Sequence, residues 1–282
     1  MVYVVLVLLG LCLGSFVNAL VWRLHEQQET EDRVGGRGSG KNSGELSILK
    51  GRSMCTHCRH ELAWYDLLPV LSWLALRGKC RYCHKPISWQ YPLVETVAAG
   101  LFSLSYAIWP YHFTAEGKVL FVFWLVFIVG FVALAVYDIR WMLLPDKLVY
   151  PLIALATAQI AAQVIFFSAG WAALSHALLG VLCLGGFFYV LFQLSKGKWI
   201  GGGDVKLGAV LGILAGSAPK SVLVLFIASV LGSLASLPLI AGKRDKRHVH
   251  VPFGPFLLVA TFIVYLFGAG MLAWYKHRLL SF

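Results

Sequence analysis

Charged side chains are scarce in this sequence, and acidic ones are scarcer than basic ones. Of 282 residues, 13 are Asp or Glu and 24 are Lys or Arg, while hydrophobic residues make up 59%. Soluble domains carry about 25% charged residues, so this composition and the mean hydropathy of +0.75 exclude an ordinary soluble protein. We therefore expect an integral membrane protein whose principal surroundings are a lipid bilayer.

A basic segment is also missing ahead of the first apolar run. Residues 1–22 carry no charge, whereas a cleaved signal begins with basic residues. This run is therefore predicted to be a spanning helix. The formal net charge of +11 does not indicate a nucleic-acid partner, because the basic residues cluster in loops between apolar runs.

Apolar runs suited to crossing about 30 Å of hydrocarbon recur along the chain. Eight are expected, near residues 2–22, 92–109, 118–137, 148–167, 171–194, 205–218, 221–241 and 252–275. The sixth is short and rich in Gly and Ala, which suits a helix packed against its neighbours. The predicted fold class is an all-α polytopic membrane protein of about eight transmembrane helices with a small cytoplasmic zinc-binding loop domain.

The distribution of Lys and Arg predicts the orientation. Twenty of the 24 lie in the loops 23–91, 138–147, 195–206 and 242–251, which the positive-inside rule places in the cytoplasm, with both termini outside. Three parts are expected: a first transmembrane helix over 1–24, a cytoplasmic loop over 25–91 and a transmembrane core over 92–282. Within the loop, 26–45 is almost devoid of apolar residues and is predicted to be a flexible tether, followed by a four-cysteine module over 52–90.

Four of the six cysteines form two C-x2-C pairs in that loop: Cys55, Cys58, Cys80 and Cys83. Two such turns can close a tetrahedral four-thiolate shell, so the spacing predicts a structural zinc ion with no open position for substrate. A pair of disulfides is disfavoured in a reducing compartment. Two further arrangements stay open: four unrelated buried thiols, and a neighbouring histidine (His57, His60 or His84) in place of one cysteine.

Two aspartates fall at the predicted cytoplasmic boundary. Asp138 ends the third expected span and Asp204, in GGGDVKL, opens the sixth. Two carboxyl groups that share one proton can activate water and protonate a scissile carbonyl, which is aspartic-protease chemistry. Structural roles are also open, with a solvated Asp138 paired with Arg140 and an Asp204 that caps its helix. Asp146, after a proline, is predicted to be an N-cap rather than a catalytic residue.

Other classes of function fit less well. A proton-coupled transporter also uses intramembrane acids, but it places them near the midplane and usually shows repeat symmetry. Here both acids lie at one face and no repeat is evident. A zinc-ribbon scaffold with a membrane anchor would not need eight spans.

Six motifs, in order, resemble the type IV prepilin peptidases, which are bifunctional leader peptidases and N-methyltransferases of bacterial inner membranes. They are GSFVNALVWRL at 14–24, the cysteine pairs enclosing YDLLPVLSWLALRGKC, KPISWQYPLVE at 85–95, YDIRWMLLPD at 137–146, GGGDVKL at 201–207 and VPFGPFL at 251–257. One departure is Thr56, where the family often has proline after the first cysteine; it affects turn stiffness rather than metal binding.

This resemblance implies that Asp138 and Asp204 are the catalytic pair, the second in the GxGD signature of intramembrane aspartic proteases. The implied substrate is a prepilin, or a pseudopilin of type II secretion, with a short basic leader cut at the cytoplasmic face. The new amino terminus is then methylated from S-adenosylmethionine. The oligomeric state is not predicted.

Beyond the pair, Glu95 is the acid of most interest, because it lies just inside the second expected span. A role in methylation or in holding the substrate amine and a structural bond to the cysteine module both stay open. Gly14 and Asn18, one turn apart, suit helix packing with a polar contact. Pro252, Gly254 and Pro255 are expected to shape entry into the last span and to border the active site.

Overall fold

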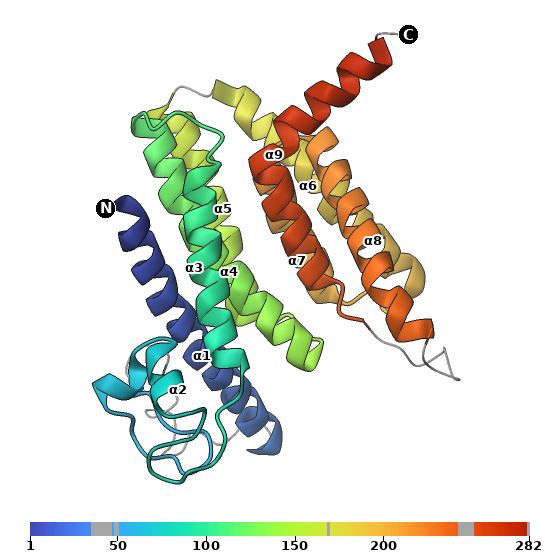
Figure 1. Ribbon diagram of the computed structural model, residues 1–282. Helices are drawn as coiled ribbons and strands as arrows, with labels where there is room; N and C mark the ends of the chain where they lie inside the picture. The colour runs from blue at the N-terminus through green and yellow to red at the C-terminus, as the bar shows by residue number, and fades with distance from the viewer. Residues whose placement is uncertain (35–46, 48–50, 168–169, 242–250, 281–282) are drawn as a thin grey trace. The chain divides into compact units, whose positions relative to one another are not determined.

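The computed structural model describes residues 1–34, 47, 51–167, 170–241 and 251–280, and Figure 1 shows their path. Within these ranges the regular structure is helical apart from two isolated β-bridges. The chain divides into two compact units, Met1–Ala107 and Ile108–Phe282. Residues 35–45 of the expected tether and 242–250 of the last basic loop lie outside the described residues.

The first unit is built on two long helices, α1 (Val2–Val34) and α3 (Gln90–Ala107), which run alongside one another in Figure 1. Between them in sequence come the cysteine module, the short 3-10 helix η1 (Trp64–Leu67) and α2 (Leu71–Ala75). The boundary after residue 107 groups α3 with this unit, whereas the sequence-based division begins the core at residue 92.

Small residues let α1 and α3 approach closely. A methyl group on Gly10 would lie 2.6 Å from the Cα of Ala99, and one on Gly14 would lie 2.7 Å from the Cα of Glu95. One turn further on, the side-chain amide of Asn18 donates to the carbonyl of Tyr91 at 3.2 Å. The packing role expected for Gly14 and Asn18 is therefore present.

The first part of the expected tether differs from the prediction. Residues 26–34 continue α1 instead of forming a flexible segment. Glu and Gln are strong helix formers, and in this segment their propensity prevails over the lack of apolar residues. The imidazole of His25 lies 3.2 Å from the carboxylate of Glu29 one turn on, and the hydroxyl of Thr30 donates to the carbonyl of Glu26.

The second unit contains six helices among its described residues: α4 (Ala115–Trp141), α5 (Asp146–Phe166), α6 (Gly170–Ser195), α7 (Gly202–Ala215), α8 (Ala218–Ala241) and α9 (Gly254–Leu280). The short helix α7 contacts α5, α6, α8 and α9, which makes it the centre of this unit. Its backbone touches that of α6 where Gly212 meets Gly180, and neither position has room for a methyl group.

Six helices within the described ranges are long and apolar enough to cross a membrane: the first 30 residues of α1, together with α4, α5, α6, most of α8 and most of α9. The runs expected at 92–109 and 205–218 do form helices, α3 and α7, of 18 and 14 residues, but neither belongs to this group. The expected count of eight spans is thus not confirmed.

Candidate active site and metal centre

Asp138 lies near the carboxyl end of α4 and is 5% exposed. The helix ends just after it, because Met142 takes a left-handed conformation (φ 54°) and returns its N–H to the carbonyl of Asp138 at 2.8 Å. A helix C-terminus disfavours negative charge, so this carboxylate needs other donors. The anticipated partner does not supply them: Arg140 is exposed, and its guanidinium lies over the ring of Trp141.

Asp204 occupies the first turn of α7 and is half-buried. Gly201, rather than Asp204, is the N-cap residue of this helix. The N–H of Gly201 donates to Oδ2 of Asp204 at 3.3 Å, and the N–H of Asp204 donates to the carbonyl of Gly201 at 3.1 Å. This reciprocal arrangement resembles a capping box and fixes the carboxylate at the helix N-terminus.

The two carboxyl groups lie close enough to interact electrostatically. The backbone N–H of Gly254, the first residue of α9, also donates to Asp138. Leu144 packs where these parts meet, because a methyl on Gly203 would lie 2.9 Å from its Cβ and one on Gly254 would lie 3.7 Å from its Cδ2. The ends of α4, α7 and α9 therefore form one site around two acids.

The three glycines before Asp204 have different surroundings. Gly203 is closed in by Leu144, so glycine is required there for packing. A methyl on Gly201 or Gly202 would come no closer than 3.6 Å or 3.9 Å to another atom, and both residues are exposed. Their lack of a side chain therefore leaves an accessible backbone beside the two acids, which suits close approach of a peptide.

Asp146 is separate from this pair in its interactions. Pro145 is the N-cap residue of α5, so the expectation that Asp146 caps the helix is wrong in detail. Its two carboxylate oxygens instead accept from Nζ of Lys206 at 2.6 and 2.8 Å. This exposed ion pair joins the start of α5 to α7, just after the GGGD turn, and it could not be predicted from the sequence because its partners are distant in the chain.

The cysteine pairs form two matching turns. The N–H of Cys55 donates to the carbonyl of His60, and Arg59 returns its N–H to the carbonyl of Cys55, each at 2.9 Å; both bonds recur around Cys80. Arg59 and His84 hold equivalent left-handed positions, each with φ 56°. The matching geometry presents two thiols per turn to a common centre.

The four thiols form a cluster that can hold a metal ion. Their sulfur atoms all lie within 4.8 Å of one another, and those of Cys55 and Cys83 are 3.9 Å apart. A tetrahedral zinc site with bonds of about 2.3 Å implies sulfur separations of about 3.8 Å. All six cysteines are free, and among the described residues this cluster contains no histidine.

The electrostatics of the cluster also call for a cation. Burial raises the pKa of the Cys55 thiol, but hydrogen bonds from the amides of Cys58 and His57 and from the thiols of Cys80 and Cys58 together outweigh it and lower that pKa to about 7. For Cys83 the amide of Lys85 lowers the pKa, yet burial and the neighbouring thiols raise it to about 11. One thiolate forms readily, whereas four adjacent thiolates at neutral pH require a positive ion between them.

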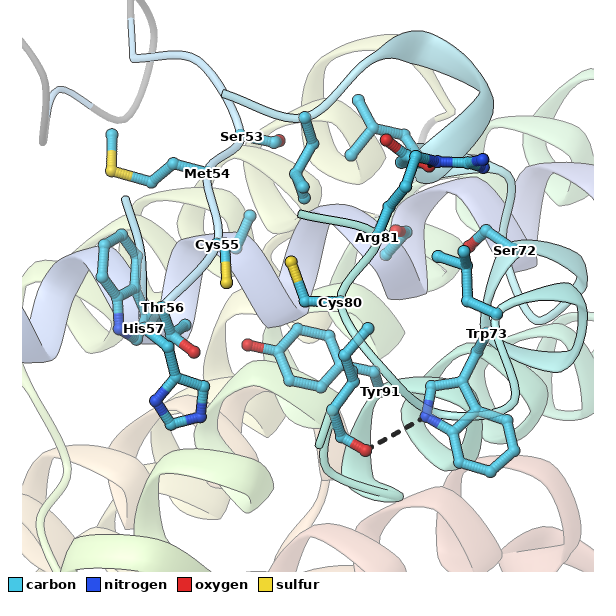
Figure 2. A pocket seen from close by; sticks show the side chains of 18 of the residues that line it. Ser53, Met54, Cys55, Thr56, His57, Ser72, Trp73, Cys80, Arg81 and Tyr91 are labelled. Carbon is cyan, nitrogen blue, oxygen red and sulfur yellow. Dashed lines mark hydrogen bonds and ion pairs between the residues drawn. The ribbon is translucent and has the colours of Figure 1, made fainter. Parts of the chain in front are cut away.

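Glu95 is buried (5% exposed), and one of its oxygens accepts a 2.7 Å hydrogen bond from the N–H of Val70 in the cysteine module. Val70 has φ 59°, which is rare for a β-branched residue. The structural bond to the module is therefore present. Glu95 also lines a pocket, drawn in Figure 2, that extends between α1, α3 and the cysteine turns.

Comparison with known proteins covers both units. Residues 8–109 match the model of the bacterial peptidase A24 N-terminal domain, and residues 125–237 match that of the type IV leader peptidase family. No solved structure matches significantly.

Relatives named "prepilin leader peptidase/N-methyltransferase" align over almost their whole length. The protein of Stutzerimonas stutzeri is 34% identical over 95% of this chain and 91% of its own. That of Aeromonas hydrophila is 33% identical over 97% and 93%, and that of Pseudomonas aeruginosa 34% over 93% and 89%. None of the three is named as a transporter, so the transporter hypothesis gains no support.

Proposed function

The chain belongs to the type IV leader peptidase family, and we propose that it removes the leader of a type IV prepilin or type II secretion pseudopilin and methylates the new amino terminus. The observation that carries the proposal is that Asp138 and Asp204, from distant helices, lie close enough to interact electrostatically. The relatives' names agree with both activities.

The two acids perform the cleavage with one proton between them. The ionised carboxylate takes a proton from water as the water oxygen attacks the scissile carbonyl, and the protonated partner donates to the carbonyl oxygen. The tetrahedral intermediate then collapses, the peptide C–N bond breaks, and a carboxyl group returns its proton to the leaving amine. The amide of Gly254 keeps the Asp138 carboxyl group oriented during these steps.

The surroundings of the acids suit an extended peptide. Gly201 and Gly202 leave exposed backbone N–H and carbonyl groups beside Asp204, without side chains in the way. A leader that ends in glycine, as the family's substrates do, also has little bulk at the cleavage site. Two glycine-rich backbones can therefore lie within hydrogen-bonding distance.

We further propose a multi-pass position in the bacterial inner membrane, in which α3 and α7 join the six longer apolar helices. α7 is largely enclosed by other helices, so it needs less apolar length than a lipid-facing span. α3 packs on α1 and leaves Leu93, Val97 and Leu104 exposed, which suits contact with lipid. Asp138 and Asp204 lie at helix ends next to basic loops, which supports a cytoplasmic active site and periplasmic termini.

The proposal also includes a metal ion and a methyl donor. The four cysteines hold a structural zinc ion that joins the two turns of the module, with no position left for a substrate. S-adenosylmethionine supplies the methyl group. Neither is needed for peptide hydrolysis by the aspartate pair.

Single substitutions test the peptidase assignment. Asp138→Asn and Asp204→Asn keep the size of the side chain but remove the shared proton, so each should lower cleavage of a prepilin at least about 100-fold. Asp146→Asn is the matched control, since this neighbouring acid is exposed and ion-paired with Lys206. Membranes are compared by the mass of the processed pilin at equal enzyme content. Normal processing by either aspartate variant would refute the assignment.

A further inference from the structure

The first unit contains a pocket that takes no part in the cleavage chemistry. It is partly open and offers about 140 Å³ of unfilled space, enough for roughly ten water molecules. Figure 2 shows Ser72 and Trp73 on one side of it and Cys55 and His57 on the opposite side, with Tyr91 between them. All of its lining residues lie within Met1–Ala107, whereas both catalytic aspartates belong to the other unit.

Charges of both signs face this pocket from different elements. The carboxyl group of Glu95 comes from α3, and that of Asp66, whose side chain is 2% exposed, comes from η1. Arg81 contributes a guanidinium, held by a 2.9 Å bond from its Nε to Asp66. Arg23 contributes a second, buried guanidinium that already donates to backbone carbonyls. The lining therefore suits a ligand that carries both positive and negative groups.

Glu95 retains capacity to bind such a ligand. A carboxylate offers about four acceptor sites on two oxygens. The N–H of Val70 and the side chain of Ser15 use part of this capacity and fix the position of the group. A buried acid already held in place by the protein loses little freedom when it pairs with a cation.

The aromatic wall is rigid as well. The indole N–H of Trp73 donates to the carbonyl of Ile87 at 3.2 Å, and its ring packs against that of Trp89 with centroids 4.1 Å apart. Gly78, with φ 70°, passes so close to this ring that a methyl group would lie 2.9 Å from it. Trp73 thus presents a fixed π surface, which binds flat heterocycles by stacking and cations by their charge.

We propose that this pocket is the binding site for S-adenosylmethionine, with the adenine against Trp73 or Tyr91 and the sulfonium facing Glu95. The donor combines a flat heterocycle, a fixed positive sulfur and an amino-acid group of both charges, which matches the lining. This inference rests on the proposed methyltransferase function and extends it by assigning the donor to a site separate from the aspartate pair.

The carboxylate of Glu95 also explains why the product leaves after methyl transfer. The neutral amine of the processed pilin attacks the methyl carbon, the carbon–sulfur bond breaks with its electrons on sulfur, and a methylammonium and S-adenosylhomocysteine result. The sulfur has then lost its positive charge. Because Glu95 attracts only the charged sulfonium, the pocket should hold the donor more tightly than the spent product.

Filling the pocket tests its assignment. Ser72→Phe, on α2, places a ring in the space, whereas Ala75→Phe adds the same ring to an exposed position of the same helix outside the lining. Binding of labelled S-adenosylmethionine to the purified full chain in detergent should weaken about ten-fold or more in the first variant and stay unchanged in the second. Equal binding by wild type and Ser72→Phe would overturn the site.

A measurement on the wild-type chain tests the same proposal if Ser72→Phe does not fold. Ultraviolet cross-linking of labelled S-adenosylmethionine, followed by peptide mass mapping, should place the adduct between residues 15 and 95. Adducts confined to residues 108–282 would overturn the proposal.

The role of Glu95 has its own test. Wild type should prefer S-adenosylmethionine over S-adenosylhomocysteine by about ten-fold, the scale of a charge-assisted contact. Glu95→Gln keeps the shape and removes the charge, so the two ligands should then bind with nearly equal affinity. If Glu95→Gln kept the wild-type preference for S-adenosylmethionine, the sulfonium would not face Glu95.

These measurements are independent of the peptidase assignment. A wild-type chain that binds the donor in this pocket but cleaves no prepilin refutes the proposed peptidase function alone. A wild-type chain that cleaves prepilin, with donor binding unaffected by Ser72→Phe, refutes the pocket alone.

Discussion

The backbone N–H of Gly254 donates a hydrogen bond to the carboxyl group of Asp138. This bond links the first residue of α9 to the last turns of α4, and it sets the positive end of one helix against an acid at the negative end of another. It also explains glycine at this position, since a methyl group would collide with Oδ2 of Asp138. The VPFGP segment therefore belongs to the proposed active site through its backbone.

Gly254→Ala should consequently lower the cleavage rate. The added methyl displaces the Asp138 carboxyl group from its orientation, and an error of about 1 Å in such a group costs on the order of 100-fold in rate. Gly270→Ala is the control, because it lies in the same helix with no neighbour within 4 Å of the added methyl. Prepilin processing is timed for both variants at equal folded protein. Full activity of Gly254→Ala would show that this contact does not position the acid.

The packing of α1 on α3 leads to a stability prediction. Gly10→Ala places a methyl 2.6 Å from the Cα of Ala99, so the helices must separate, and overpacking of this kind costs about 1–3 kcal/mol. Gly100→Ala, on α3 itself, meets nothing within 4 Å and should be neutral or slightly stabilising. Unfolding of both variants in mixed micelles is followed by circular dichroism. Equal stability would mean that the interface yields without cost.

Much of the site is predictable because it depends on chemistry carried by short motifs. The two C-x2-C pairs define a metal-binding spacing, and an acid beside GGG at the start of an apolar run is costly enough to indicate function. The sequence therefore predicts the clustering of Cys55 with Cys83 and draws attention to Asp138 and Asp204.

What the sequence does not reveal depends on packing between distant residues. Lys206 pairs with Asp146 only because α7 lies against α5 in the folded chain. The continuation of α1 to Val34 is not evident from hydrophobicity, because a polar segment also suits a disordered chain, although residues such as Glu26 and Glu29 favour helix. The positive φ of Val70 also has no local signal, since β-branched residues disfavour it.

That conformation leads to a third prediction. Val70→Gly removes the steric cost of φ 59°, on the order of 1–3 kcal/mol, and adds about 1 kcal/mol of chain entropy to the unfolded state. We therefore expect a small gain in thermal stability, with the N–H to Glu95 retained. Val70→Pro excludes this φ and removes the donor, so it should be clearly destabilising. If both variants lowered the melting temperature equally, strain at this position would not be the cause.

Loss of one thiol should release the metal from the cysteine module. Cys80→Ser removes one of four ligands and leaves three adjacent thiols, while Cys12→Ser changes an exposed cysteine outside the cluster. We expect about one zinc per chain in wild type and Cys12→Ser, and far less in Cys80→Ser, by metal analysis of purified protein.

Binding of zinc to the metal-free chain should also weaken as the pH falls below about 7, because Cys55 then takes up a proton that the metal must displace. Stoichiometric zinc in Cys80→Ser, or an affinity that does not change between about pH 6 and pH 8, would contradict a four-thiolate site.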